Sequence, residues 1–316
     1  MHYFLSRRDL FLTVSVSVSF QRNYYPCASI TSVVKLIQKL LSVLSNFTMT
    51  NWKEKIIVIT GASSGIGEGT ALHFAKLGAK LFITGRNGDN LQKTKDQCVQ
   101  LGLPSDNIGS VVGDITDKAD QSRILSGAIE KYGKIDVLVN NAGMVHFLKI
   151  EDTSDKEYDE MFDTNVKAQF MLTKAAMEYL KQTKGNIVFV SSICGSRPMG
   201  ELPVYCMSKA AIDMFTQCLA LELAPFGVRV NTVSPGAIVS KITRRVESGY
   251  QSDEDYQKFL VAEAARHPLG RVGVPQDVAS SISFLASDEA SFISGQILYV
   301  DGARHCVTGG ITTSVK

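Results

Sequence analysis

Patterns that bind metals or form disulfides are absent from this 316-residue sequence. The histidines form no H-E-x-x-H motif, and no C-x-x-C pair occurs among the six cysteines at positions 27, 98, 194, 206, 218 and 306. Thiols scattered in this way are typical of reduced cysteines rather than of a disulfide framework or a zinc site. We therefore expect no metal centre and no structural disulfides.

Excess charge of one sign and long apolar runs are also missing. The net charge is +2 at pH 7, and no long basic run occurs beyond residue 48. Nucleic-acid-binding proteins usually present a basic face, so we expect no nucleic-acid partner. The apolar run at residues 10–20, LFLTVSVSVSF, is too short to cross a bilayer, and we expect no membrane span.

The first 48 residues differ in composition from the rest. They are rich in serine and hold one acid, Asp9, against the basic residues Arg7, Arg8, Arg22, Lys35 and Lys39. Paired arginines before an apolar stretch resemble a secretory start, whereas the acid-poor character resembles a mitochondrial transit peptide. A third interpretation makes Met49 the working start. We rank that start or a transit peptide above secretion, and expect a cytoplasmic protein, or a mitochondrial one if residues 1–48 act as a transit peptide.

Beyond this extension, short β-branched runs alternate with longer helical patterns. The strand-like runs are 55–60, 80–84, 108–113, 135–140, 186–191, 228–233 and 296–300, and the helical patterns include 67–77, 118–132, 155–182 and 205–223. Most runs lack strict polar alternation, which is typical of strands covered on both faces. This order predicts an α/β fold with a doubly wound (Rossmann) parallel seven-stranded sheet, forming a single domain at 49–305 with a C-terminal tail at 306–316.

A long insertion separates the last two strands, at about residues 234–295, and it is polar and partly helical. It follows the sixth strand and therefore leaves the carboxyl edge of the sheet, where α/β folds bind their ligands. Segments at that edge often close over a site, so we expect this insertion to form a substrate lid.

A glycine-rich turn, TGASSGIG at 60–67, follows the first strand and opens a helix. Gly61, Gly65 and Gly67 permit a tight turn and a close approach of the backbone to a pyrophosphate. The helix N-terminus supplies N–H donors and a positive dipole. The sequence therefore predicts a dinucleotide-binding site at this turn.

Tyr205 and Lys209 are four residues apart in a helical pattern, so their head groups converge on one face. Taken alone, the pair could also be two surface residues without a functional role. Tyrosine ordinarily has a pKa of about 10. A cation about 4 Å away at an effective dielectric of about 20 supplies about 4 kcal/mol, enough to lower that pKa by about three units. An oxidised nicotinamide ring would add a second positive charge beside Lys209.

Several short motifs occur together in the order seen in one enzyme family. They are TGASSGIG at 60–67, DI at 114–115, NNAG at 140–143, TNV around Asn165, VSS at 190–192, YCMSK at 205–209 and SPG at 234–236. Over about residues 52–305 the chain resembles a short-chain dehydrogenase/reductase. The resemblance implies a nicotinamide-dependent oxidoreductase that interconverts a carbonyl and a primary or secondary alcohol by hydride transfer. The alternatives are an NAD-dependent alcohol, steroid or sugar dehydrogenase and a non-catalytic nucleotide-binding regulator.

The resemblance implies a catalytic set of Asn165, Ser192, Tyr205 and Lys209. Tyr205 would donate a proton to the carbonyl oxygen as hydride arrives, and Lys209 would also hold the ribose hydroxyls. Ser192, thirteen residues before Tyr205, would hydrogen-bond the substrate oxygen. Ser191 is its rival, because adjacent strand residues face opposite sides. Asn165 would bind a water that relays protons to Lys209.

The resemblance also implies which residues border the cofactor. Asp114 and Ile115 would flank the adenine, the NNAG turn would pack beside the cofactor, and Ile238 and Ser240 would meet the nicotinamide carboxamide. The expected cofactor set is Gly61, Ser63, Ser64, Gly65, Ile66, Gly67, Arg86, Asp114, Ile115, Asn141, Ala142, Gly143, Tyr205, Lys209, Pro235, Gly236, Ile238 and Ser240.

The end of the second strand, FITGRN at 82–87, bears on the choice of cofactor. Gly85 stands where NAD-using members of the family usually carry Asp, Arg86 follows directly, and the nearest downstream carboxylate is Asp89. An arginine fork suits a 2′-phosphate, to which the serines of the glycine turn would add hydroxyl donors. We expect NADP(H) to be preferred over NAD(H), and hence a reductase.

The partner we expect is a small-molecule carbonyl or alcohol, bound by a homotetramer or homodimer as the family resemblance suggests. Pocket-lining candidates are His146, Phe147, Met199 and the segment 240–265. An apolar lining fits steroids, retinoids, quinones and small ketones alike, so the sequence does not select among them.

Overall fold

The computed structural model describes residues 50–240, 242, 245–246, 249–250 and 252–307. These residues belong to one compact unit. The predictions for the extension at 1–48, and for the tail beyond residue 307, concern residues that the structure does not describe. Among the described residues, no helix is both long and apolar enough to cross a membrane.

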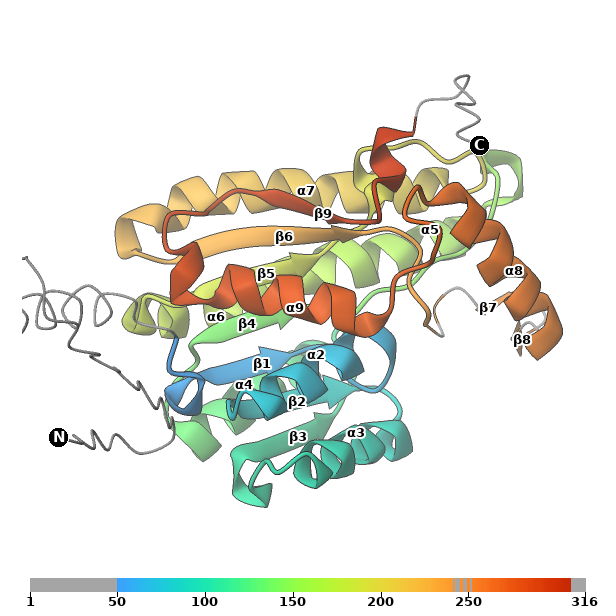
Figure 1. Cartoon of the computed structure of the whole chain (residues 1–316). Helices are drawn as coiled ribbons and strands as arrows, with labels where there is room; N and C mark the ends of the chain where they lie inside the picture. The colour runs from blue at the N-terminus through green and yellow to red at the C-terminus, as the bar shows by residue number, and fades with distance from the viewer. Residues whose placement is uncertain (1–49, 241, 243–244, 247–248, 251, 308–316) are drawn as a thin grey trace, which may run out of the picture. The chain divides into compact units, whose positions relative to one another are not determined.

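A seven-stranded parallel sheet forms the centre of the unit, in the order β3-β2-β1-β4-β5-β6-β9 (Figure 1). This confirms the predicted doubly wound sheet, and its strand order reverses between β1 and β4, where ligands bind in such folds. The strands are β1 (Ile56–Ile59), β2 (Lys80–Gly85), β3 (Ile108–Val112), β4 (Val137–Asn140), β5 (Asn186–Val190), β6 (Arg229–Pro235) and β9 (Ile297–Val300).

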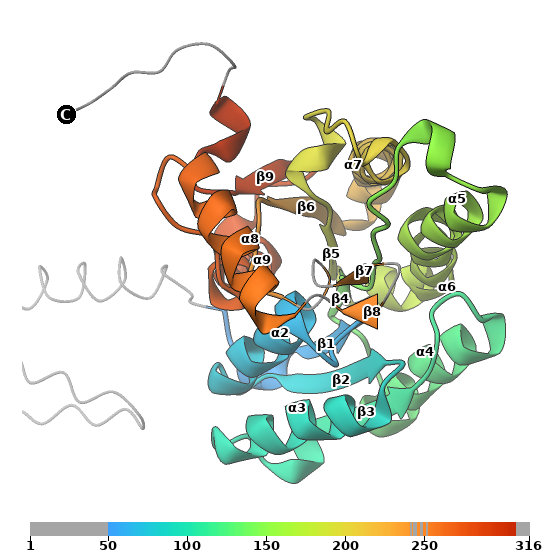
Figure 2. The same ribbon diagram turned by 90° about the vertical axis from the view of Figure 1, so that its right-hand side faces the viewer.

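Helices cover both faces of the sheet, as Figure 2 shows. One face packs against α2 (Gly65–Lys76), α3 (Gly88–Gln100) and α9 (Pro275–Ala286). The other packs against α4 (Lys118–Tyr132), α6 (Ala168–Thr183) and α7 (Pro203–Leu223). Each layer encloses its own apolar core. Because both faces are covered, the strands carry apolar side chains in succession, as in β1, where all four residues are buried.

The helical pattern at 155–182 is interrupted, which its periodicity did not predict. The chain forms α5 (Asp155–Phe162), a π-helical turn η4 (Asp163–Lys167) and then α6. Asn165 lies in this π turn and is fully buried. Such turns insert an extra residue into a helix and are frequent at functional sites.

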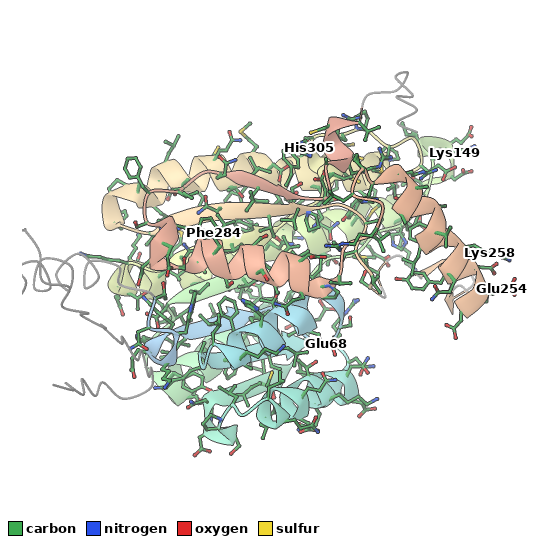
Figure 3. The ribbon with its side chains drawn as sticks, viewed as in Figure 1. Glu68, Lys149, Glu254, Lys258, Phe284 and His305 are labelled. Atoms are coloured by element: carbon green, nitrogen blue, oxygen red, sulfur yellow. The ribbon has the colours of Figure 1, made fainter. Side chains whose placement is uncertain are left out.

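The insertion at 234–295 has two different parts. Residues after β6 form a short antiparallel pair, β7 (Arg245–Val246) with β8 (Gly249–Tyr250), followed by α8 (Asp253–Arg266). Glu254 and Lys258 on α8 point away from the body of the unit (Figure 3). Lys258 Nζ lies 2.8 Å from Glu254 Oε1. In contrast, α9 buries Val278 and Ile282 completely against the sheet. The lid stays a prediction for the part through α8, whereas α9 is a core helix.

Candidate active site

The glycine turn lies at the carboxyl end of β1. Gly61 (φ +66°) and Gly65 (φ +59°) have left-handed backbone conformations that favour glycine. A Cβ atom at Gly67 would lie 2.3 Å from the Gly61 carbonyl oxygen. The close packing of this turn therefore depends on glycine, as the motif predicts.

The start of α2 faces the same edge of the sheet. Ser64 is its N-cap residue, and the Ser64 side chain makes no capping hydrogen bond. The side chain of Ile66 packs into the core below the turn. Backbone N–H groups in the first turn of a helix have no partner within the helix. The glycine turn and this helix start therefore form a cradle suited to a pyrophosphate.

The NNAG turn after β4 fixes the glycine turn from the side. Thr60 Oγ1 accepts hydrogen bonds from the backbone N–H groups of Asn141 and Ala142, each at 3.0 Å. The Asn141 Nδ2 atom donates to the Thr60 carbonyl at 2.8 Å. A Cβ atom at Gly143 would lie 3.6 Å from Lys209 Nζ. The turn thus joins the cofactor cradle to the predicted catalytic residues.

The end of β2 shows how the predicted 2′-phosphate region is built. A Cβ atom at Gly85 would lie 2.8 Å from Ser63 Oγ, so a larger residue there would displace Ser63. Arg86 Nη1 lies 3.6 Å from Asp114 Oδ2. Asp89 is the nearest carboxylate downstream along the chain, but the expectation that no carboxylate lies close to Arg86 in space is wrong. Because β2 and β3 pair in parallel, the chain after β3 brings Asp114 beside Arg86.

The environment of Asp114 favours its charged form. Partial burial acts to raise the pKa of Asp114, but hydrogen bonds from Thr116 and the positive charge of Arg86 hold that pKa below its ordinary value. The next residue, Ile115, is buried, and its carbonyl accepts a hydrogen bond of 2.6 Å from Gln121 Nε2. These contacts fix the predicted adenine-binding segment to α4.

The loop after β6, where the nicotinamide is expected, is held by a buried histidine. The Ala237 N–H donates to His267 Nε2 at 3.2 Å, and His267 Nδ1 lies 2.6 Å from the Glu263 carbonyl oxygen. Since Ala237 donates to Nε2, the proton of a neutral His267 is on Nδ1, where it donates to Glu263. A Cβ atom at Gly236 would lie 2.7 Å from His267 Nε2. This histidine therefore ties the end of α8 to the loop after Pro235.

The far end of this loop is also attached to α8. The Tyr256 hydroxyl accepts from the Ser240 N–H at 3.0 Å and donates to the Ser240 carbonyl at 2.9 Å. Ile238 is buried and forms a β-bridge with Gly273. A Cβ atom at Gly65 would lie 3.1 Å from the Ser240 Cβ, so the loop reaches back to the glycine turn.

The side-chain amide group of Asn165 donates two hydrogen bonds. Its Nδ2 atom donates to the Met144 carbonyl at 2.9 Å and to Ser208 Oγ at 3.1 Å. Its Oδ1 atom accepts from the Met144 N–H at 2.9 Å. The side chain therefore joins the π turn, the segment after β4 and α7, within which Lys209 lies.

The two serines after β5 face different partners. Ser192 caps the short turn η5 (Ile193–Gly195), where its Oγ accepts from the Cys194 N–H at 3.2 Å. A hydrogen bond with Ser192 also acts to lower the pKa of Tyr205. Ser191 is buried, and its Oγ donates to the Lys209 carbonyl at 3.3 Å. Ser192 therefore lies beside Tyr205, whereas Ser191 faces the backbone of α7.

Tyr205 and Lys209 lie one turn apart near the start of α7. Lys209 is 3% exposed, its Nζ donates to the Val190 carbonyl at 2.9 Å, and it lies 5.6 Å from the centroid of the Tyr205 ring. Burial raises the pKa of Tyr205, and Cys194 acts in the same direction. Burial lowers the pKa of Lys209 to about 8, opposed by the charge of Asp213.

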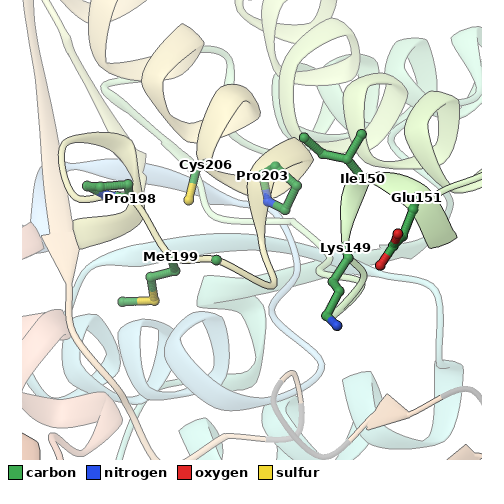
Figure 4. A pocket seen from close by; sticks show the side chains of 8 residues that line it. Lys149, Ile150, Glu151, Pro198, Met199, Pro203 and Cys206 are labelled. Carbon is green, nitrogen blue, oxygen red and sulfur yellow. The ribbon is translucent and has the colours of Figure 1, made fainter.

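A cavity of about 600 Å³ lies close to Tyr205, and Met199, Tyr205 and Cys206 belong to one apolar cluster. Figure 4 shows Met199 and Cys206 on one side of the cavity and Lys149 and Glu151 on the other. The lining residues are Lys149, Ile150, Glu151, Pro198, Met199, Gly200, Pro203 and Cys206. Of the predicted pocket residues, Met199 lines this cavity.

Two other pocket candidates have different surroundings. His146 Nε2 lies 3.2 Å from Glu160 Oε2, so its ring faces α5. Phe147 is 41% exposed and is not among the residues that line the cavity containing Met199. The described residues contain no group of three histidine, cysteine or acidic side chains that could hold a metal ion.

Three residues of the site escaped the sequence reasoning. His267 and Tyr256 belong to no short motif, and their partners lie 30 and 16 residues away along the chain. Asp213 was detectable, because it continues the four-residue spacing of Tyr205 and Lys209 by one more turn.

Known proteins share this sequence and fold. Residues 61–305 match the family model described as enoyl-(acyl carrier protein) reductase. The chain is 36% identical over 252 residues to the 3-oxoacyl-(acyl-carrier-protein) reductase FabG of Thermotoga maritima, covering 78% of this chain and 96% of that protein.

Two solved structures extend the comparison. A short-chain dehydrogenase/reductase of unknown function from Caenorhabditis elegans, solved with cofactor, has a TM-score of 0.77 at 36% identity, covering 82% of this chain and 98% of that one. The 3-ketoacyl-(acyl-carrier-protein) reductase of Brucella melitensis, in complex with NADH, has a TM-score of 0.71 at 32% identity, covering 79% and 98%. The chain therefore belongs to the short-chain dehydrogenase/reductase family of nicotinamide-dependent oxidoreductases.

Proposed function

We propose that the protein is an NADP(H)-dependent reductase of apolar carbonyl compounds. The nicotinamide cofactor supplies the hydride when bound. The chain's own residues provide the cradle, the proton and the substrate pocket. Gly61, Gly65 and Gly67 leave room for the pyrophosphate at the start of α2, and Arg86 with Ser63 receives the 2′-phosphate.

The placement of four side chains supports the catalytic roles that we propose for them. Tyr205 donates its hydroxyl proton to the carbonyl oxygen, and Ser192, on the adjacent turn, hydrogen-bonds that oxygen as negative charge develops. The Lys209 ammonium stabilises the Tyr205 oxygen after the proton has left. Asn165 holds the segment after β4 against α7 and so keeps this group in place.

The proposed substrate class is supported by the cavity that Cys206, the residue after Tyr205, helps to line. Ile150, Pro198, Met199 and Pro203 give it an apolar lining, with Lys149 and Glu151 as its only charged members. A volume of about 600 Å³ is in the range of cavities that bind drug-sized molecules. The pocket therefore favours a carbonyl compound with a bulky apolar body.

The observation that carries the cofactor preference is the lack of space for a side chain between position 85 and Ser63. Ser63 Oγ occupies the space in which an acidic side chain at position 85 would begin. A carboxylate at that position could therefore reach the ribose only by displacing Ser63. The planar guanidinium of Arg86 is suited to bind the oxygens of a 2′-phosphate. The ion pair between Arg86 and Asp114 favours a second candidate, an NAD(H)-dependent dehydrogenase, because Asp114 already neutralises Arg86.

The ratio of kcat/KM for NADPH to that for NADH, on one carbonyl substrate, separates these candidates. We expect NADPH to be preferred and Arg86→Ala to lose most of that preference through a higher KM for NADPH. Lys93→Ala is the matched control, because it removes one exposed positive charge from α3, the helix that follows Arg86. Equal values for the two cofactors, or a preference that survives Arg86→Ala, would exclude the proposed role of Arg86.

A further inference from the structure

Three side chains that follow β9 form a hydrogen-bonded series. Asp301 comes directly after this strand, and His305 and Cys306 belong to the short turn η9 (Arg304–Cys306), which the label of His305 marks in Figure 3. His305 Nδ1 lies 2.8 Å from Asp301 Oδ2, and His305 Nε2 lies 3.2 Å from Cys306 Sγ. A thiol, an imidazole and a carboxylate therefore lie in the order of a nucleophile, its base and the group that orients the base.

These contacts determine which nitrogen of His305 accepts a hydrogen bond. A carboxylate accepts and does not donate, so the proton of a neutral His305 is on Nδ1, where it is donated to Asp301. The Nε2 atom is then an acceptor, and the thiol of Cys306 is the donor that lies beside it. His305 is therefore placed to receive the thiol proton of Cys306.

The carboxylate that orients His305 is itself held in place. Asp301 is 7% exposed, and it accepts from the backbone N–H groups of Ala303 at 3.1 Å and of His305 at 2.6 Å. The His305 ring stacks on the Tyr299 ring, with centroids 4.0 Å apart and an angle of 11° between the planes. The imidazole is therefore fixed at its edge by Asp301 and on its face by Tyr299. A base held in this way can act without rearrangement.

The backbone on both sides of Cys306 is attached to the loop after η5. Arg197 Nη1 donates to the His305 carbonyl, and Arg197 Nη2 donates to the Val307 carbonyl. Among the described cysteines, Cys306 and Cys218 are exposed. A dissolved reagent can therefore reach the thiol of Cys306 while the surrounding backbone stays fixed.

The reaction that suits this group is exchange with a disulfide. Cys306 gives its proton to His305 Nε2, and the thiolate attacks one sulfur of the disulfide. The S–S bond of the reagent breaks, an S–S bond to Cys306 forms, and the leaving thiolate takes the proton from His305. The Cys306 sulfur is oxidised and the released half of the reagent is reduced, so the reaction needs no further oxidant. A cavity of about 490 Å³, which Tyr299, Asp301 and His305 help to line, offers room for the half that stays attached.

We propose that Cys306 is a modification site, a nucleophilic thiol that His305 and Asp301 activate for exchange with small disulfides to give a mixed disulfide on the protein. This exchange needs a base for the thiol and an acid for the leaving group, and His305 supplies both. Acyl transfer would also need hydrogen-bond donors for an oxyanion. The exchange uses none of the residues to which we assign carbonyl reduction.

The test measures the rate at which each cysteine of the full chain forms a mixed disulfide. The reduced protein is mixed with glutathione disulfide at pH 7, samples are quenched with acid, and peptide mass spectrometry gives the rates at Cys306 and Cys218. We expect Cys306 to react at least about tenfold faster than Cys218, because a positioned base contributes a factor of this size or more. The rate at Cys218, an exposed cysteine on α7, is the control within each sample.

Two variants distinguish activation by the base from exposure alone. His305→Phe keeps an aromatic ring to stack on Tyr299 but has no nitrogen, and it should remove most of the preference for Cys306. His305→Gln, which keeps a polar side chain, should do the same and provides the test where the phenylalanine variant does not fold. Iodoacetamide, an uncharged reagent, should show the same preference and the same loss, because the base acts on the thiol and not on the reagent. Equal rates at Cys306 and Cys218 in the wild type, or a preference for Cys306 that both variants retain, would overturn the proposal.

Discussion

Burial pushes Tyr205 and Lys209 towards their neutral forms, and this sets the chemistry of the site. The pKa of the phenol is raised and that of the ammonium is lowered to about 8. A protonated phenol suits an acid in carbonyl reduction. A charged lysine would stabilise the phenolate that follows, and the negative charge of Asp213 acts against the lowering of the Lys209 pKa by burial.

The buried carboxylate of Asp213 should weaken the fold. The pKa of Asp213 is raised from 3.8 to about 6, so the native state binds its proton more tightly than the unfolded chain. This contribution is unfavourable above pH 6 and absent below about pH 4, with a cost of up to about 3 kcal/mol. We predict that Asp213→Asn has a higher free energy of unfolding than the wild type at pH 8, and that the difference shrinks at pH 5.

Urea denaturation at the two pH values measures this difference, with Glu222→Gln as the control that should change neither value. A variant less stable than the wild type at pH 8 would mean that the carboxylate holds the fold together. Asp213 would then be a residue that stabilises the fold.

Individual site residues that occur in local motifs could be predicted from the sequence. Tyr205 and Lys209 share one helical face, and the glycines of the first turn have backbone conformations that the motif requires. Contacts made across the sheet were missed. Asp114 reaches Arg86 from the next strand, and the distance along the chain between them, 28 residues, gave no sign of this contact.

The strands and most helices were predictable because period and length distinguish them. The π turn was not, because one extra residue within a helix leaves the apolar pattern on either side almost unchanged. The role of α9 was also missed. Its polar neighbours suggested a surface insertion, whereas Val278 and Ile282 are fully buried against the sheet.

His267 holds the loop after β6 against the end of α8, because its ring contacts both Ala237 and Glu263. His267→Leu keeps the apolar packing but leaves the Ala237 N–H without its acceptor, which typically costs about 1–3 kcal/mol. We expect the Kd for NADPH, measured by its fluorescence, to rise about tenfold, since 1.4 kcal/mol corresponds to a factor of about 10.

The control is Arg266→Ala, the neighbouring residue, which pairs with Glu263 at the surface. It should leave the Kd within about twofold of the wild type, because an exposed ion pair contributes little. An unchanged Kd in His267→Leu would show that the loop keeps its conformation without the histidine.

For the whole molecule, composition and the order of elements were sufficient to predict the fold class, because alternating strands and helices have few stable arrangements. The substrate was not predictable from them. The lining of the cavity comes from two segments, 149–151 and 198–206, whose proximity depends on the tertiary fold.

Thr50, at the start of the described residues, is held to the turn after α9 by two hydrogen bonds. Thr50 Oγ1 donates to Glu289 Oε2 at 2.9 Å and accepts from the Asp288 N–H at 2.7 Å. We predict that the chain beginning at Met49 is soluble and retains kcat/KM within about twofold, because these contacts remain. A chain beginning at Lys53 loses them, together with the contact between Trp52 and Phe74, and should unfold at a lower temperature. Aggregation of the chain from Met49 would place residues 1–48 within the folded unit.

We propose that Tyr205 is the acid with which this chain reduces carbonyl compounds. NADPH consumption with a panel of apolar aldehydes, ketones and diketones, followed at the nicotinamide absorbance band, measures this activity. We predict turnover by the wild type and a loss of about 10²-fold or more in Tyr205→Phe, with the Kd for NADPH retained because only a hydroxyl is removed. Near-normal turnover by folded Tyr205→Phe would contradict the account.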